Sequence, residues 1–278
     1  MTEALRGTNS IDKRPFPSAT RVVAHGVARP AAGLAMLTLA VALAATLAST
    51  AAVAGDRPFS QLQRAVWEDD DEQVLSLNLN HRRSRDLRST GLGVEYAVSP
   101  AWSLELELGW QKDRAAGTRE RSVELAGQYL FNNIARDDYG LGIAASVEWS
   151  RPSGAAMAYE KARIVGVYSL PIGAAGAGFV HANLGLLDDV NVKKKAPRVV
   201  WAVGVEHDLA SRTVGFAEFA AVGLRPREAE LHLGVRQWIR REKLAVDLSV
   251  AREVQRAFAG GERKNSVMLN VSFYDIKL

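Results

Sequence analysis

The chain has no cysteine among its 278 residues. This absence excludes disulfide bonds, thiolate metal sites and cysteine nucleophiles. It also suits a protein that crosses an oxidising periplasm unfolded, although many unrelated proteins lack cysteine as well.

Long apolar runs are missing from the chain after residue 55. The hydrophobic fraction is 47%, yet no uninterrupted stretch there reaches the ~20 residues that a membrane-spanning helix needs. Any membrane embedding of this part of the chain must therefore use strands.

The chain also lacks a strong charge and the usual motifs of enzymes and nucleic-acid binders. The net charge is +4, of which residues 1–54 carry +3, so the remainder carries about +1. No zinc-finger spacing, aromatic RNA-binding motif or basic helix is present, and we expect no nucleic-acid partner. No phosphate-binding glycine loop, two-histidine metal spacing or nucleophile elbow appears either, so we predict no cofactor, metal site or catalytic residues.

Residues 1–54 have the pattern of a secretory signal peptide. Scattered Arg and Lys residues precede an uncharged, alanine-rich stretch at 30–54, which ends in Ala52-Val53-Ala54 before the polar sequence GDRPF. Small residues in this spacing are typical of a signal-peptidase site, which places the mature start at Gly55. The alternative is an uncleaved helical anchor, because the stretch is long enough to span a bilayer.

The rest of the chain is dominated by a two-residue period. In residues 102–110, WSLELELGW, Trp and Leu alternate with Ser, Glu and Gly. A period of two indicates a strand with one apolar and one polar face, whereas a helix would spread the apolar residues around its surface. The pattern predicts about twelve strands, near 72–82, 88–98, 101–112, 120–132, 138–150, 157–170, 176–187, 197–207, 212–223, 228–240, 242–252 and 264–276. In the sixth strand Lys161 and Arg163 share a parity with Val165 and Val167, and we expect a bulge there.

The polar face is rich in small residues, which suits the concave side of a closed sheet. The apolar face carries aromatic residues at both ends of its strands: Trp102, Trp110, Tyr139 and Trp149. The interval from Trp102 to Trp110 spans ~20 Å in a tilted strand, close to the ~25 Å lipid-facing band between the aromatic girdles of membrane barrels. We therefore predict an all-β protein, a closed antiparallel transmembrane up-and-down β-barrel at 72–278, preceded by a periplasmic N-terminal segment at 55–71. A soluble β-protein with its apolar face inside is the alternative.

An even strand number places both termini in the periplasm, so the connection between the first two strands lies outside the cell. The looser, basic connections at 82–88, 112–121, 188–198 and 252–264 then face the exterior. There their Arg and Lys side chains would meet the phosphates of outer-membrane lipid and lipopolysaccharide. The alternative is that these are merely solvated loop charges.

As a whole, residues 72–278 resemble the Gram-negative outer-membrane β-barrels. Segments such as YSLPIG at 168–173 and GVEHDLASRTVGFAEF at 204–219 are similar to strand-turn-strand phrases of small transporter barrels, including the meta-pathway phenol-degradation type. The resemblance implies location in the bacterial outer membrane and insertion by the barrel-assembly machinery. That machinery commonly reads a terminal aromatic residue, whereas this chain ends Tyr274-Asp275-Ile276-Lys277-Leu278.

Ionisable residues with the parity of the polar face are the candidates for the lumen lining: Glu95, Glu105, Glu107, Glu124, Glu148, Arg163, His181, Glu206, Glu218, Arg236 and Asp247. Buried charges persist only when they are paired or hydrated. The lumen is therefore either a narrow, cation-favouring channel for small solutes or a plug of salt bridges without transport. The N-terminal segment at 55–71 is also a candidate to enter the barrel from the periplasm. A lipid-modifying enzyme is a further alternative, which would need a His near the outer leaflet; His207 falls at a periplasmic turn instead.

The cleavage prediction has a direct test. Mass spectrometry of the protein recovered from membranes should find Gly55 at the N-terminus, because signal peptidase cuts after the Ala-x-Ala sequence. Recovery of an intact 30–54 segment would favour the anchored alternative, while a start at Ala51 would only move the boundary.

Overall fold

The computed structural model describes residues 62–66, 74–173, 177–190, 196–224, 228–254 and 265–277. The predicted signal peptide at 1–54 lies outside these ranges, as does most of the predicted periplasmic segment at 55–71. Among the described residues, no helix combines the length and apolarity needed to cross a membrane.

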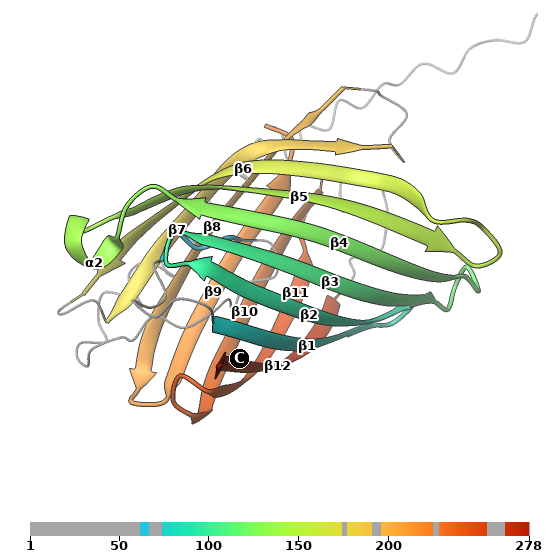
Figure 1. Ribbon diagram of the computed structural model, residues 1–278. Coiled ribbons are helices and arrows are strands. Elements are labelled where there is room, and N and C mark those ends of the chain that lie inside the picture. Colours follow the sequence, from blue (N-terminus) through green and yellow to red (C-terminus); the bar gives the residue numbers. More distant parts are fainter. Residues whose placement is uncertain are drawn as a thin grey trace, which may run out of the picture.

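Twelve antiparallel strands form one closed barrel, in which each strand pairs with its neighbours in sequence and β1 pairs with β12 (Figure 1). This confirms the predicted fold class and strand number. The strands are β1 Val74–Ser84, β2 Leu87–Ser99, β3 Trp102–Asp113, β4 Arg119–Leu130, β5 Gly140–Pro152, β6 Ala158–Ile172, β7 Gly178–Asp189, β8 Arg198–Ala210, β9 Thr213–Val222, β10 Glu228–Arg240, β11 Leu244–Glu253 and β12 Asn265–Lys277.

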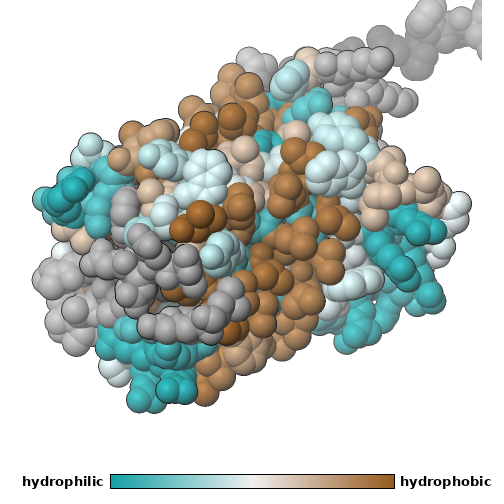
Figure 2. Space-filling view, in the orientation of Figure 1, coloured by the Kyte–Doolittle hydropathy of each residue, from teal (hydrophilic) through white to brown (hydrophobic). Residues whose placement is uncertain are grey.

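The outer face is apolar, as the alternation predicts. Leu104, Leu106 and Leu125 expose 42–51% of their surface, while residues of the opposite parity point inward. Figure 2 shows hydrophobic residues gathered around the middle of the barrel, with hydrophilic residues at both ends. A surface of this kind is stable only when a bilayer covers it, because soluble proteins seldom expose so large an apolar patch.

Two aromatic girdles border the apolar band. Trp102, Trp110 and Tyr139 lie on the outer face with 43–44% of their surface exposed, and Trp149 is half-buried opposite Tyr159. At the periplasmic end, the rings of Trp102 and Tyr129 meet edge to face with their centroids 5.9 Å apart, and the rings of Tyr139 and Tyr168 stack with their centroids 6.3 Å apart.

One connection differs from the prediction. The basic stretch 82–88 is a tight turn rather than a loose loop, because β1 continues to Ser84 and β2 begins at Leu87. Between β4 and β5 lies a one-turn helix, α2 (Ile134–Asp137), whose N-cap Asn133 accepts a hydrogen bond from the Ala135 backbone. Its buried Ile134 faces the barrel's periplasmic end.

The sixth strand contains the bulge that the sequence predicts. Its register with β5 shifts between Tyr159 and Lys161, and Val165 and Val167 keep the parity of Lys161 and Arg163. Both valines therefore point into the barrel, where they are 3% and 0% exposed. Because both valines are buried, apolar atoms inside the barrel must cover them.

The C-terminal strand ends with one aromatic residue on each face. Tyr274 has the inward parity of Ser266 and Ser272 and is 8% exposed, with its ring centroid 5.4 Å from that of Trp238. The register irregularity opposite Leu75–Leu77 follows Phe273 along β12. The aromatic residue on the outer face is Phe273, with 46% exposed. If the assembly machinery reads a lipid-facing aromatic residue here, we expect that residue to be Phe273.

The fold predicts the behaviour of the purified protein. In detergent the mature chain should give a β-rich circular-dichroism spectrum and migrate faster on SDS gels before boiling than after, because the closed sheet resists SDS. A mainly helical spectrum, or full solubility without detergent, would be incompatible with a lipid-facing outer surface.

Candidate functional site

All eleven predicted lumen-lining residues lie on the inner side of the barrel. They separate into two groups: an acidic row on β2–β5, made of Glu95, Glu105, Glu107, Glu124 and Glu148, and a network of paired charges on β6–β11, which includes His181, Glu206, Glu218, Arg236 and Asp247. Arg163 lies between the groups, on β6.

Cross-strand pairing brings the glutamates of the acidic row together. Glu95 lies opposite Glu105, Glu107 opposite Glu124, and Glu124 opposite Glu148. Like charges in such positions repel each other unless cations or water lie between them. Lys161 supplies one cation, at 2.6 Å from Glu148, and Asn80 donates a hydrogen bond to Glu107 at 3.1 Å.

A cavity of about 410 Å³ lies in front of this row and extends to the end of the barrel where Asp189, Arg198 and Glu228 lie. We call it the vestibule. Its lining includes the carboxylates of Glu105, Glu107 and Glu124 and the cations of Lys161, Arg163 and Arg198. Arg198 also binds Asp189 at 3.0 Å and Glu228 at 3.2 Å near the exterior ends of their strands. The vestibule is therefore polar and lined by charges of both signs.

The periplasmic half of the lumen holds the chain's own N-terminal segment, Leu62–Val66, which we call the plug. Its backbone is bound from several strands: Leu62 donates to Glu218 on β9 at 2.8 Å, Ala65 donates to Ser169 on β6 at 2.8 Å, and Gln128 on β4 donates to the Arg64 carbonyl at 2.5 Å. The Asn183 side chain on β7, with its amide nitrogen toward the Gln63 carbonyl, donates a hydrogen bond to that carbonyl at 2.9 Å. Its amide oxygen accepts a hydrogen bond from the Gln63 backbone N–H at 2.8 Å.

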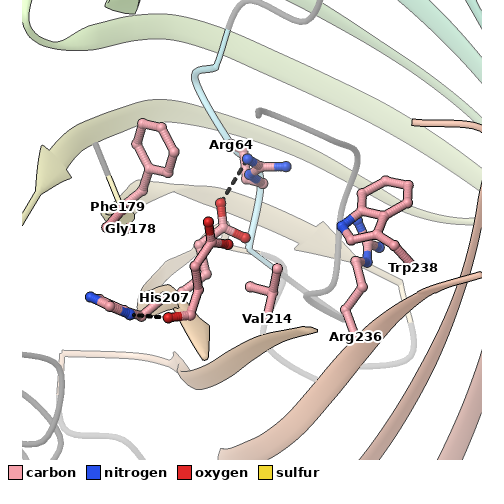
Figure 3. A pocket seen from close by; sticks show the side chains of 10 residues that line it. Arg64, Gly178, Phe179, His207, Val214, Arg236 and Trp238 are labelled. Carbon is pink, nitrogen blue, oxygen red and sulfur yellow. Dashed lines mark hydrogen bonds and ion pairs between the residues drawn. The ribbon is translucent and has the colours of Figure 1, made fainter. Parts of the chain in front are cut away.

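Arg64 provides the charged contact of the plug. Its guanidinium lies 2.7 Å from Glu206 on β8, and both side chains are almost fully buried (Figure 3). Removing one partner of a buried ion pair leaves an uncompensated charge and costs ~3–5 kcal/mol. While the plug lies in the barrel, Arg64 and Glu206 therefore each compensate the buried charge of the other.

Apolar residues of the plug each match an apolar patch on the wall. Leu62 packs with Phe216 and Ala220, and Ala65 packs with Val165 and Val167. This cover is the reason that the two valines of β6 point inward. Val66 completes the set against Ile134 and Phe179.

Gly140 makes room for the plug. A Cβ atom at this position would lie 1.7 Å from the Ala65 carbonyl oxygen and 2.8 Å from its carbonyl carbon. Because backbone atoms cannot give way as a flexible side chain does, any larger residue at 140 must displace the plug or the strand.

Ser169, His181 and Glu206 form a chain of polar contacts next to the plug. Ser169 Oγ lies 2.7 Å from His181 Nδ1, and His181 Nε2 lies 3.5 Å from Glu206. The order resembles a Ser-His-acid catalytic set. Here, however, Ser169 and His181 are 0% exposed, and the plug engages both ends of the chain through Ala65 and Arg64. The three residues anchor the plug in this conformation.

A further network lies beside the plug on β10–β12. Arg236 binds Asp247 at 2.7 and 2.9 Å and lies 5.4 Å from the Trp238 ring. Asn270 also donates to Asp247, at 2.9 Å. Between Arg64 and Arg236 the remaining cavity is only about 20 Å³, room for a single water molecule.

Several residues of the site were absent from the prediction. Ser169, Trp238 and Tyr274 were not among the lumen candidates, and the entry of the N-terminal segment was only one of the alternatives. The parity of Val165 and Val167 was the available signal, because inward valines imply an apolar partner inside. His207 lies near the end of β8 that leads into the turn before β9, and it is 6% exposed.

Among the described residues, no group of three or more His, Asp or Glu side chains is arranged as a metal site.

Comparison with known proteins identifies the fold. No family model and no curated protein matches the sequence. Among solved structures, a KdgM porin in complex with disordered oligogalacturonate aligns with a TM-score of 0.53 at 9% identity, over 71% of this chain and 98% of that chain. A NanC porin aligns with a TM-score of 0.51 at 12% identity, over 72% and 98%. The narrower resemblance to phenol-degradation barrels stays a prediction, and at these identities the likeness concerns the fold alone: this chain has the closed-barrel fold of outer-membrane porins.

Proposed function

We propose that this protein is a narrow channel for small solutes in the bacterial outer membrane, closed on its periplasmic side by the plug. The vestibule carries the proposal, because its charged walls enclose open space where a purely structural barrel would pack side chains. Charges that line such a space are hydrated and available to a solute. The fold likeness to two porins supports the same function.

The charges of the vestibule favour small cationic solutes. The acidic row places several carboxylates along one wall, and charged rings of this kind select cations in pores. Lys161, Arg163 and Arg198 line the same cavity. An anionic group of the same solute would compete there with the carboxylates that Lys161 and Arg198 already bind.

A permanently plugged barrel is the second candidate, and the close fit of the plug favours it. Backbone hydrogen bonds, the Arg64–Glu206 pair and three apolar contacts hold five residues in place. The two candidates differ in one respect: a channel must conduct once the plug is released, whereas a structural barrel would lose stability without opening a selective path.

The first test releases the plug. In planar bilayers the wild-type chain should be mostly silent, while Gly140→Val should raise the open probability at least tenfold, because the added side chain cannot coexist with Ala65. Gly166→Val is the matched control, since a Cβ there meets only the Leu184 carbonyl at 3.7 Å. Leu62→Asp provides a second route, by placing a carboxylate beside Glu218 without altering the barrel wall.

Persistent silence of both variants, with heat-modifiable gel mobility retained, would favour the permanently plugged barrel. Hydrolysis of lipid by the opened variant, lost on Ser169→Ala, would instead revive an enzymatic function for Ser169, His181 and Glu206.

The second test concerns selectivity. In the Gly140→Val background, Glu105→Gln with Glu107→Gln should lower the cation-to-anion permeability ratio at least twofold, because two carboxylates leave the vestibule wall. Reversal potentials in a salt gradient measure the ratio. Glu242→Gln, at the exposed periplasmic turn between β10 and β11, removes a charge outside the lumen and should leave the ratio unchanged. If the cation-to-anion permeability ratio fell equally in both variants, the acidic row would not be the cause of the selectivity.

A further inference from the structure

A row of basic residues crosses the outer face of the barrel at its exterior rim. On neighbouring strands Arg83 lies opposite Arg88, Arg88 opposite Lys112, and Lys112 opposite Arg119. Two residues nearer the membrane along β4, Arg121 lies opposite Arg151 on β5. We call these six residues the basic row.

The basic row points away from the lumen and is open to its surroundings. All six side chains are exposed. Their neighbour Arg82 has the opposite parity and forms an ion pair with Glu230 inside the barrel, which places Arg83 on the outer face. Arg151 donates a hydrogen bond to the Ala155 carbonyl at 2.8 Å. Within the described ranges, none of the six has a carboxylate partner.

This arrangement needs counter-charges from outside the chain. Like charges directly opposite each other on a sheet repel and destabilise it. The six residues lie in paired strands, so the sheet holds them at fixed spacing and they cannot separate as charges on a loop would. Anions bound between them would turn the repulsion into attraction.

The height of the basic row identifies the source of those anions. Trp110, part of the exterior girdle, lies directly opposite Arg121 on β4. Lys112 is two residues farther along β3, ~7 Å at the usual strand rise. Aromatic girdles mark the edge of the hydrocarbon layer, so the basic row lies at the height of the lipid phosphates.

We propose that the basic row is a binding site for the phosphate groups of one lipopolysaccharide molecule in the outer leaflet. Arginine holds phosphate through two parallel N–H···O bonds and lysine through a point charge. The lipid's acyl chains lie against the apolar band below, where Leu92 and Leu108 occupy the same outer face. The bound lipid thereby supplies the counter-charges that the strand pairs lack.

The test uses the full mature protein in detergent and purified bisphosphorylated lipid A as the probe. Wild-type protein should bind lipid A, and the triple variant Arg88→Gln, Lys112→Gln and Arg119→Gln should bind it at least tenfold more weakly. The matched control removes three exposed cations at the periplasmic end, by Arg212→Gln, Arg240→Gln and Arg241→Gln, and should change affinity less than twofold. Native mass spectrometry gives the stoichiometry and the relative affinity.

A second readout is the temperature at which the heat-modifiable gel band disappears. Lipid A should raise this temperature for the wild type and the control but not for the triple variant, whose folding is verified by the same band. Dephosphorylated lipid A should be ineffective. Equal binding by the triple variant would overturn the proposal, and equal affinity for phosphatidylglycerol would overturn its assignment to lipopolysaccharide.

Discussion

A polypeptide inside a bilayer must satisfy every backbone hydrogen bond within itself, since lipid tails offer no partners. In this chain the pairing of β1 with β12 meets that requirement, because it closes the sheet and leaves no edge strand. Closure also gives the barrel two faces with opposite demands. The outer face must be apolar and the inner face must pair or hydrate its charges, and the two-residue alternation along each strand fulfils both.

The charges of the inner face form two arrangements, one of paired charges and one of neighbouring carboxylates. On β6–β11 the cations and carboxylates are paired, and their bonds reach the plug through Glu206 and Glu218. On β2–β5 the carboxylates of the acidic row lie opposite one another, and Glu105, Glu107 and Glu124 line the vestibule. A charge pattern of this kind separates a packed periplasmic half from an open exterior half within one barrel.

The plug links these two halves. Its apolar residues cover a part of the wall that would otherwise expose Val165, Val167 and Phe216 to water, and Arg64 pairs with the buried carboxylate of Glu206. Release of the plug would therefore expose apolar surface and leave Glu206 without its guanidinium. Both effects favour the conformation in which the plug lies inside the barrel.

Local pattern alone was sufficient for the barrel architecture. Alternation in segments such as 102–110 determines a strand and its two faces, and its repetition along the chain determines the strand number, because side-chain direction in a strand depends only on parity. The inward parity of Glu105, Glu206 and Asp247 followed in the same way. The tertiary structure decided which inward charges meet. Strand register places Glu107 opposite Glu124, and it places Arg236 opposite Asp247. Irregularities at Tyr159–Lys161 and Leu75–Leu77 shift the register locally. The tertiary structure also decided the position of the plug, since contacts such as Leu62 with Glu218 join residues 156 positions apart and leave no periodic trace in the sequence.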